Sequence, residues 1–192
     1  MSLLRGLNGV IALMGRAPID DFPKYFGAPK PAFQNSLAAI GGSVLLIMVA
    51  ARYIILLRGQ IAGEGAAIGF PALQIGITAL LYLLAFTWLA FMVLAIFERR
   101  DHLWRWATVR HWMVFYALIP TSLMLVLAKL GVFPVMLANG LVLALFISWL
   151  FADVRLAYKL GEIGIITAVF TACMVHAIGV LVILTAVVQM IS

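Results

Sequence analysis

The stretch PALQIGITALLYLLAFTWLAFMVLAIF, residues 71–97, contains no charged side chain. A helix crosses the hydrocarbon core of a membrane with about 20 consecutive, predominantly apolar residues, and this stretch is longer than that. Four other stretches meet the same criterion, so that the five predicted spans cover residues 36–57, 71–97, 111–130, 133–152 and 163–191. The sequence therefore predicts an all-α, polytopic membrane protein with five transmembrane helices.

The composition of the whole chain agrees with this fold class. Apolar residues make up 66% and charged residues 10% of the 192 residues, whereas a soluble domain carries about 25% charged residues. The net charge of +6 comes from basic residues near the ends of the apolar stretches. That placement favours membrane lipids with anionic headgroups as partners and argues against nucleic acid.

The distribution of Lys and Arg predicts the orientation in the membrane. Ten of the 13 lie in the N-terminal segment and in the connections after the second and fourth spans, namely Arg5, Arg16, Lys24, Lys30, Arg99, Arg100, Arg105, Arg110, Arg155 and Lys159. The other three, Arg52, Arg58 and Lys129, fall on the opposite side. Because basic residues are enriched on the cytoplasmic side, we expect a plasma (bacterial inner) membrane protein with a cytoplasmic N-terminus and an external, periplasmic C-terminus.

Residues 1–35 form a separate predicted unit in front of the bundle of residues 36–192. Apolar residues recur there at helical spacing: Leu3, Leu7, Val10, Ile11 and Met14. This pattern is typical of an amphipathic helix that lies in the membrane interface, and the alternative is a retained leader without structure. Four of the seven prolines then follow within residues 16–31, which predicts a stiff collar on the cytoplasmic face.

Small residues recur four positions apart in three of the predicted spans, the first, fourth and fifth. The set in the fourth span, with an adjacent Asn, is Asn139, Gly140, Ala144 and Ser148, and the set in the fifth is Gly164, Ala168 and Ala172, followed by His176. Small residues let membrane helices approach closely, so we expect both sets to pack helices together. We expect His176 to be a neutral imidazole, hydrogen-bonded across the interface, and Asn139 to form one interhelical hydrogen bond.

The alternative role for His176 is that of a haem or quinone ligand. A haem held by two histidines would need a second histidine at a similar depth. His111 begins the predicted third span, whereas His176 lies thirteen residues into the fifth, which places it about 20 Å deeper. The two therefore cannot hold one haem between them, and the sequence favours the packing role.

The connection between the second and third spans alternates arginine with tryptophan. Its members are Arg99, Arg100, Trp104, Arg105, Trp106, Arg110 and Trp112. We interpret this set as an aromatic and basic belt at the cytoplasmic interface, with a specific anionic-lipid or protein-docking site as the functional alternative. Arg52 is expected to extend to the membrane surface, and a site for a substrate anion is its alternative.

Carboxylate side chains are absent from the predicted spans. No Asp or Glu lies inside them, because Glu98, Asp153 and Glu162 fall at their cytoplasmic ends, and proton-coupled transport usually needs buried ionisable residues. The sequence also lacks the spacings typical of metal sites and the nucleotide-binding and hydrolase motifs. We therefore expect no enzymatic activity, no cofactor and no metal ion.

The predicted topology resembles that of the Yip family of membrane proteins, the Ypt/Rab-interacting type. The shared features are five spans, a cytoplasmic N-terminus and a short external C-terminus, so the resemblance covers the whole chain. The Tyr-Gly-Pro-type signature that eukaryotic members carry before the first spans is absent, and FGAPKP, residues 26–31, is its nearest counterpart here. The resemblance implies the five-helix fold and assigns no functional residue.

Three functions follow from these observations. The first is a non-enzymatic accessory or scaffold subunit that associates with other membrane protein subunits in a larger complex. The second is a small transporter or channel subunit, which is suggested by Arg52, Pro120 and Asn139 interrupting otherwise apolar helices. The third is a lipid- or quinone-handling membrane protein built around His176. The small-residue faces and the missing carboxylates place the accessory subunit first.

Overall fold

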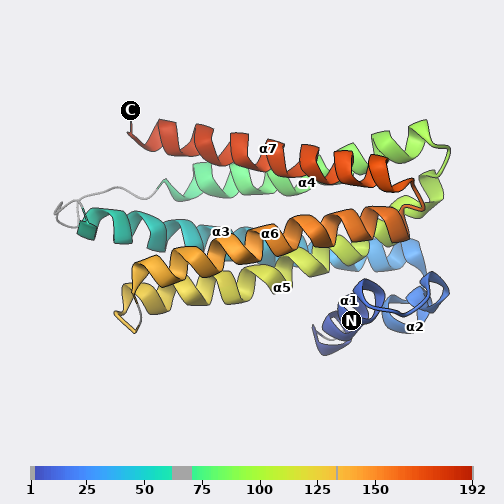
Figure 1. Ribbon diagram of the computed structural model, residues 1–192, viewed down its shortest axis with the longest axis horizontal. Helices are drawn as coiled ribbons and strands as arrows, with labels where there is room; N and C mark the ends of the chain where they lie inside the picture. The colour runs from blue at the N-terminus through green and yellow to red at the C-terminus, as the bar shows by residue number, and fades with distance from the viewer. Residues whose placement is uncertain (1–2, 62–70, 133, 192) are drawn as a thin grey trace.

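The computed structural model describes residues 3–61, 71–132 and 134–191, and all the regular structure in those ranges is helical (Figure 1). The helices are α1 (Leu3–Met14), α2 (Phe22–Phe26), α3 (Pro29–Ile61), α4 (Ala72–Ile96), α5 (Leu103–Lys129), α6 (Val135–Leu160) and α7 (Ile165–Ile191), with short 3₁₀ turns at Ile19–Asp21 and Arg100–His102. The predicted start of the fourth span at residue 133 lies outside the described residues.

Four of these helices are long and apolar enough to cross a membrane. They are the segments Pro29–Leu56, Ala72–Ile96, Arg100–Lys129 and Val135–Leu160. The chain is therefore compatible with a multi-pass membrane protein. In α7 the side chains are described as far as Leu181, and the predicted fifth span reaches beyond that residue, so the count of five stays a prediction.

The predicted starts of two spans, and the end of a third, are wrong by several residues. α3 begins at Pro29 instead of residue 36, so the proposed boundary between a collar of residues 1–35 and the bundle falls inside a helix. α5 begins at Leu103 instead of His111, and α6 ends at Leu160 instead of Ala152. An apolar window finds the part of a helix that lies in hydrocarbon, whereas a helix continues through its charged ends. Arg110, His111 and Asp153 consequently lie two turns inside their helices.

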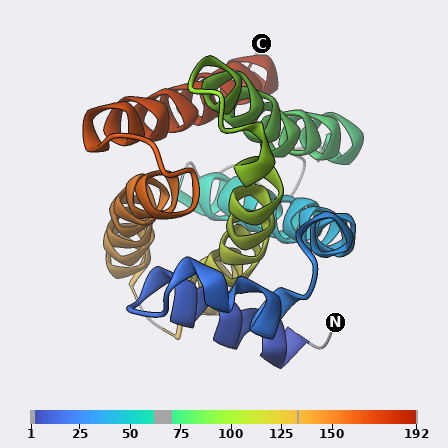
Figure 2. The same cartoon turned by 90° about the vertical axis from the view of Figure 1, so that its right-hand side faces the viewer.

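The long helices run side by side along the longest axis (Figure 1). α3, α5 and α7 begin at one end of the bundle, where α4 and α6 end, and we call this the collar end because α1 and α2 lie there (Figures 1 and 2). α5 packs between α3 and α6, whereas α7 packs against α6 and α4. α4 and α7 thus form one layer over the layer of α3, α5 and α6.

The collar consists of α1, the first 3₁₀ turn and α2, residues 3–26. Figure 2 shows α1 lying across the edge of the bundle, in contact with α5 and α6. Its buried residues are Gly6, Gly9, Val10 and Leu13. Gly9 permits a close approach to α2, because a Cβ there would lie 2.6 Å from the Phe26 ring. The opposite face of α1 exposes Leu3, Leu4 and Ile11.

The largest hydrophobic core lies at the collar end and includes buried residues from all seven helices. Trp106 and Leu94 are among its most buried side chains, and Leu13 joins the collar to it. A smaller core, formed by Ala50, Leu125, Ala128 and Ala138, lies toward the opposite end. The packing of the chain is therefore concentrated where the collar meets the bundle.

Candidate functional site

A charged pair lies inside the bundle at the collar end. Arg110 of α5 donates two hydrogen bonds to Asp153 of α6, from Nε to Oδ1 at 2.9 Å and from Nη2 to Oδ2 at 3.1 Å. Arg110 is 1% exposed and Asp153 is 2% exposed. The paired geometry matches the planar guanidinium to the carboxylate and neutralises both charges in an apolar environment. The expectation that no carboxylate lies inside a span is therefore wrong for Asp153.

Aromatic rings enclose the guanidinium of Arg110. Its central carbon lies 3.7 Å from the centroid of the Phe86 ring of α4 and 5.9 Å from that of the Trp149 ring of α6. A guanidinium over an aromatic face gains a favourable interaction with the ring electrons. Two helices, α4 and α6, thus supply the groups that surround this cation of α5.

His176 of α7 is the third member of this cluster, which we call the Arg110–Asp153–His176 cluster. Its Nδ1 lies 3.8 Å from Asp153 Oδ2 and 2.9 Å from the carbonyl oxygen of Ala172. The side chain is buried, its ring packs edge-on against Phe146 and Trp149, and Nε2 has no hydrogen-bond partner. The predicted hydrogen bond across an interface is wrong, because Ala172 belongs to the same helix.

The predicted separation in depth between His176 and His111 is also wrong. His176 lies beside Asp153, which is bound to Arg110, the residue next to His111 in α5. The cause of the error is the start of α5, which lies eight residues before His111. One carboxylate therefore connects α7 to the same turn of α5 that carries His111.

His111 forms a second polar group on another side of α5. Its Nδ1 lies 2.8 Å from Ser36 Oγ of α3, and its Nε2 lies 3.1 Å from Thr87 Oγ1 of α4. The single hydroxyl proton of Ser36 is donated to the carbonyl oxygen of Phe33 at 2.7 Å. Nδ1 must therefore be the donor to Ser36, and in the neutral tautomer Nε2 accepts the hydroxyl proton of Thr87. This tautomer satisfies both ring nitrogens.

Arg110 and His111 together connect α5 to four helices. Arg110 reaches α6, with α7 next to its partner, and His111 reaches α3 and α4. Ionisable residues in membrane helices pair inside the bundle because an unpartnered charge in hydrocarbon is costly. The arrangement fixes the relative positions of the helices, and the same residue types also form proton or ion pathways in transporters.

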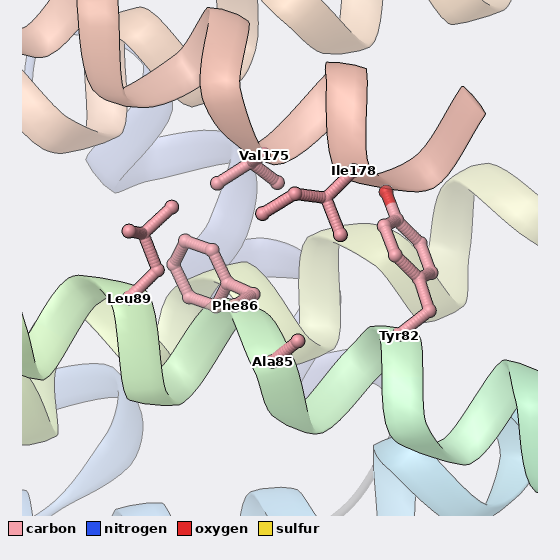
Figure 3. A pocket seen from close by; sticks show the side chains of 6 residues that line it. All are labelled: Tyr82, Ala85, Phe86, Leu89, Val175 and Ile178. Carbon is pink, nitrogen blue, oxygen red and sulfur yellow. The ribbon is translucent and has the colours of Figure 1, made fainter. Parts of the chain in front are cut away.

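A narrow apolar crevice lies beside this cluster, between α4 and α7 (Figure 3). Its lining residues are Tyr82, Ala85, Phe86, Leu89, Val175 and Ile178. The crevice has no room for a water molecule. Phe86 lines the crevice and its ring also packs against Arg110, so the crevice and the cluster share this side chain.

The predicted arginine and tryptophan belt does not form one surface. Trp106, Arg110 and Trp112 are buried, so their assignment to lipid headgroups is wrong. The reason is that consecutive residues of a helix point in different directions, and α5 is enclosed by its neighbours over this stretch. Among the remaining members, Trp104 packs on Phe33, Arg105 is half-buried, Arg100 lies over Phe91, and Arg99 pairs with Glu162 at 2.7 Å.

The two sets of small residues have different surroundings. Ala168 and Ala172 of α7 are buried, whereas Gly164 is exposed. All of Asn139, Gly140, Ala144 and Ser148 are exposed on α6, so this set does not pack helices within the chain. No atom lies within 4 Å of the place where a Cβ at Gly140 would stand. Ser148 donates its hydroxyl to the carbonyl oxygen of Ala144 on the same helix, at 2.8 Å.

Two further predictions concern Arg52 and the absence of a metal site. Arg52 is half-buried on α3 and interacts with other groups of the chain, and its role at a substrate anion stays a prediction. In the part of the chain that the structure describes, no three His, Cys, Asp or Glu side chains gather in a way that could hold a metal ion.

The sequence analysis missed Asp153 as a member of the cluster, and it missed Phe86 and Trp149 as the rings that pack against Arg110. A signal for Asp153 is present, since Leu156, Ala157 and Leu160 continue the helical apolar pattern beyond it. The positions of Phe86 and Trp149 depend on which helices are neighbours, which a single sequence does not contain.

The described part of the chain is helical, with four apolar helices and a buried ion pair. This architecture is compatible with a multi-pass membrane protein. Comparison with protein-family models, with curated proteins and with solved structures finds no match for this chain. The resemblance to the Yip family therefore stays a prediction.

Proposed function

We propose that the chain is a non-enzymatic integral membrane protein that acts as an accessory or scaffold subunit of a larger membrane complex. The observation that carries this proposal is the exposed stripe of α6 formed by Gly140, Ala144 and Ser148, with Asn139 exposed beside it. Only 6% of the apolar window of α6 is buried inside the chain, against 44% for that of α5. Among the four apolar helices, α6 thus has the smallest buried share of its apolar window.

The chemistry of this face favours a protein neighbour over lipid. Small residues lose little when they are covered and let a second backbone approach closely, and an Asn amide gains a hydrogen-bond partner across such a contact. A shallow apolar hollow lies on the same helix, lined by Pro134, Met136, Leu137, Gly140 and Leu141. A transmembrane helix of another polypeptide would fill the hollow and meet the small residues.

The proposed location is the plasma (bacterial inner) membrane, with the collar end on the cytoplasmic side and α7 as the fifth span. The ten basic residues counted above support this orientation, because the segments that carry them lie at the collar end and basic residues are enriched on the cytoplasmic side. The exposed Leu3, Leu4 and Ile11 of α1 would then lie in the interfacial layer, which suits a helix that does not cross the membrane.

Photo-crosslinking in native membranes tests the accessory role. A crosslinking amino acid replaces Ser148 on the exposed face of α6 or, as a matched control, Gly41 on α3, which has no atom within 4 Å of a Cβ. We expect adducts with a different membrane polypeptide from position 148 and none from position 41. We also expect Gly140→Leu to reduce that adduct, whereas Gly41→Leu leaves it unchanged.

The mass of the species extracted in mild detergent provides the second measurement. An assembly that contains other polypeptides and is much larger than the 20.9 kDa chain is the expected result. Isolation of a monomer or a homo-oligomer, with no heterologous adduct from position 148, would overturn the accessory role.

A small transporter is the second candidate function, and the Arg110–Asp153–His176 cluster is the observation that favours it, because intramembrane ionisable residues form ion and proton pathways. Proton flux into proteoliposomes, followed with a pH-sensitive dye under an imposed membrane potential, tests it. A flux that is lost in His176→Gln would support transport over the accessory role.

The third candidate function, lipid or quinone handling, rests on the unpartnered Nε2 of His176. Analysis of quinones extracted from the purified chain tests it.

A further inference from the structure

Basic side chains of α6 meet the C-terminal end of α1. Lys159 Nζ donates hydrogen bonds to the carbonyl oxygens of Leu13, at 2.8 Å, and Gly15, at 3.1 Å. Arg155 Nη2 donates to the same carbonyl of Gly15 at 2.7 Å. Arg16 follows directly and is exposed. We call Arg16, Arg155 and Lys159 the basic corner, and its members come from segments about 140 residues apart in the chain.

The positive charge of the basic corner is held in place without being neutralised. Its hydrogen-bond acceptors are backbone carbonyls, which carry no net charge. In the described ranges of the chain, the ion pairs of Asp and Glu involve Arg99, His102, Arg110 and His176 and none of these three residues. The corner thus differs from Arg110, whose carboxylate partner balances its charge, and it still attracts an anion.

Lipid-facing surface borders the basic corner. Phe151 and Tyr158 of α6 are 69% and 55% exposed, and they lie four residues before and three residues after Arg155, on the same side of the helix. On the α1 side, Ile11 is exposed in the last turn before the corner. An anionic headgroup at the corner would place its acyl chains against apolar side chains, which a free anion would not use.

We propose that Arg155 and Lys159, together with Arg16, bind the phosphate of an anionic phospholipid at the junction of α1 and α6. Arg presents several donors to phosphate oxygens, and the anchoring bonds to Leu13 and Gly15 hold both cations in position before the lipid arrives. The inference rests on the proposed location in a membrane and is independent of the proposed accessory role.

Native mass spectrometry of the purified chain in a nonionic detergent tests the site with phosphatidylglycerol and phosphatidylcholine as probes. We expect the wild-type chain to bind phosphatidylglycerol more tightly. Each basic residue near a headgroup contributes roughly fivefold in affinity, so the double variant Arg155→Gln/Lys159→Gln should bind phosphatidylglycerol about 30-fold more weakly. Binding of phosphatidylcholine should not change.

Two control variants separate lipid binding from a purely structural role of these cations. The exchange Arg155→Lys/Lys159→Arg keeps both charges and should keep the preference for phosphatidylglycerol. Lys30→Gln removes an exposed cation in the first turn of α3, at the same end of the bundle, and should leave this preference unchanged. Circular dichroism checks that the variants keep their helical content.

Three results would overturn the proposal. One is equal binding of the two lipids by the wild-type chain, and another is a loss in Lys30→Gln as large as in the double variant. The third is displacement of phosphatidylglycerol by an equal concentration of inorganic phosphate, which would assign the corner to free phosphate. Because the purified single chain is measured, each result is independent of whether the chain assembles with other polypeptides.

Discussion

α5 and α6 are both long apolar helices, but they occupy opposite kinds of position in the bundle. The apolar window of α5 is 44% buried and that of α6 is 6% buried. α5 nevertheless carries the adjacent polar residues Arg110 and His111, and α6 places Asp153 inside and Asn139 outside. Mean apolarity therefore directs a helix into a membrane, whereas the partners of its few polar side chains determine where in the bundle it lies.

The largest expected effect comes from breaking the ion pair that joins these two helices. Arg110→Ala or Asp153→Ala leaves one uncompensated buried charge, and we expect each to lower the free energy of unfolding by about 3–5 kcal/mol. Replacing both residues, as Arg110→Met/Asp153→Leu, removes both charges and should be less damaging than either single change. Thermal unfolding in detergent, followed by tryptophan fluorescence, measures the difference. A double variant less stable than both single variants would contradict the structural role of the pair.

A smaller effect is expected from adding one methyl group at a glycine in the α3–α5 contact, compared with glycines on the exposed surface. A Cβ at Gly42 of α3 would lie 2.6 Å from the Phe115 ring of α5, whereas Cβ atoms at Gly41 and Gly140 would meet no atom within 4 Å. Gly42→Ala should therefore destabilise the chain by about 1–3 kcal/mol. Gly41→Ala and Gly140→Ala should be neutral or stabilise it by up to about 1 kcal/mol, because Ala favours a helix. Equal shifts in all three melting temperatures would show that α5 does not face α3 this closely.

The smallest expected effect compares two serines. Ser36 accepts a hydrogen bond from buried His111, whereas Ser148 bonds only a carbonyl of its own helix on the exposed side of α6. Ser36→Ala should cost about 1 kcal/mol, because the His111 N–H loses its acceptor. Ser148→Ala should stay within about 0.5 kcal/mol of the wild type. The same thermal unfolding experiment compares the stabilities of the two variants. A larger loss of stability in Ser148→Ala than in Ser36→Ala would contradict the assignment of Ser36 to a buried face and Ser148 to an exposed face.

The helices could be predicted from the sequence better than their ends or their partners. A count of apolar residues locates α3 to α6 because hydrocarbon selects for uninterrupted apolar length. The same count stops at the first charged residue, and for that reason Asp153 is placed outside a span although the helix continues to Leu160. The true ends depend on the pattern of buried residues beyond the charge.

The candidate site was harder to predict because its contacts join distant parts of the chain. Arg110 and Asp153 are 43 residues apart and Ser36 and His111 are 75 residues apart, whereas periodicity reports only on neighbours within one helix. The sequence indicates that Ala168, Ala172 and His176 share a face of α7. It does not indicate that α6, with Asp153, covers that face.

The hydrogen bonds that hold α1 have a consequence for synthesis of the protein. Tyr116, whose hydroxyl binds the carbonyl oxygen of Leu3, comes 113 residues later, and Arg155 comes 140 residues after Gly15. At a translation rate of about 5–20 residues per second, the ribosome needs roughly 7–30 s to synthesise the 140 residues from Gly15 to Arg155. Until Tyr116 and Arg155 have been made, α1 can pack on α2 but lacks its partners on α5 and α6. The first helix of the chain is therefore among the last to dock, and its apolar residues need other cover, such as lipid or a chaperone, until then.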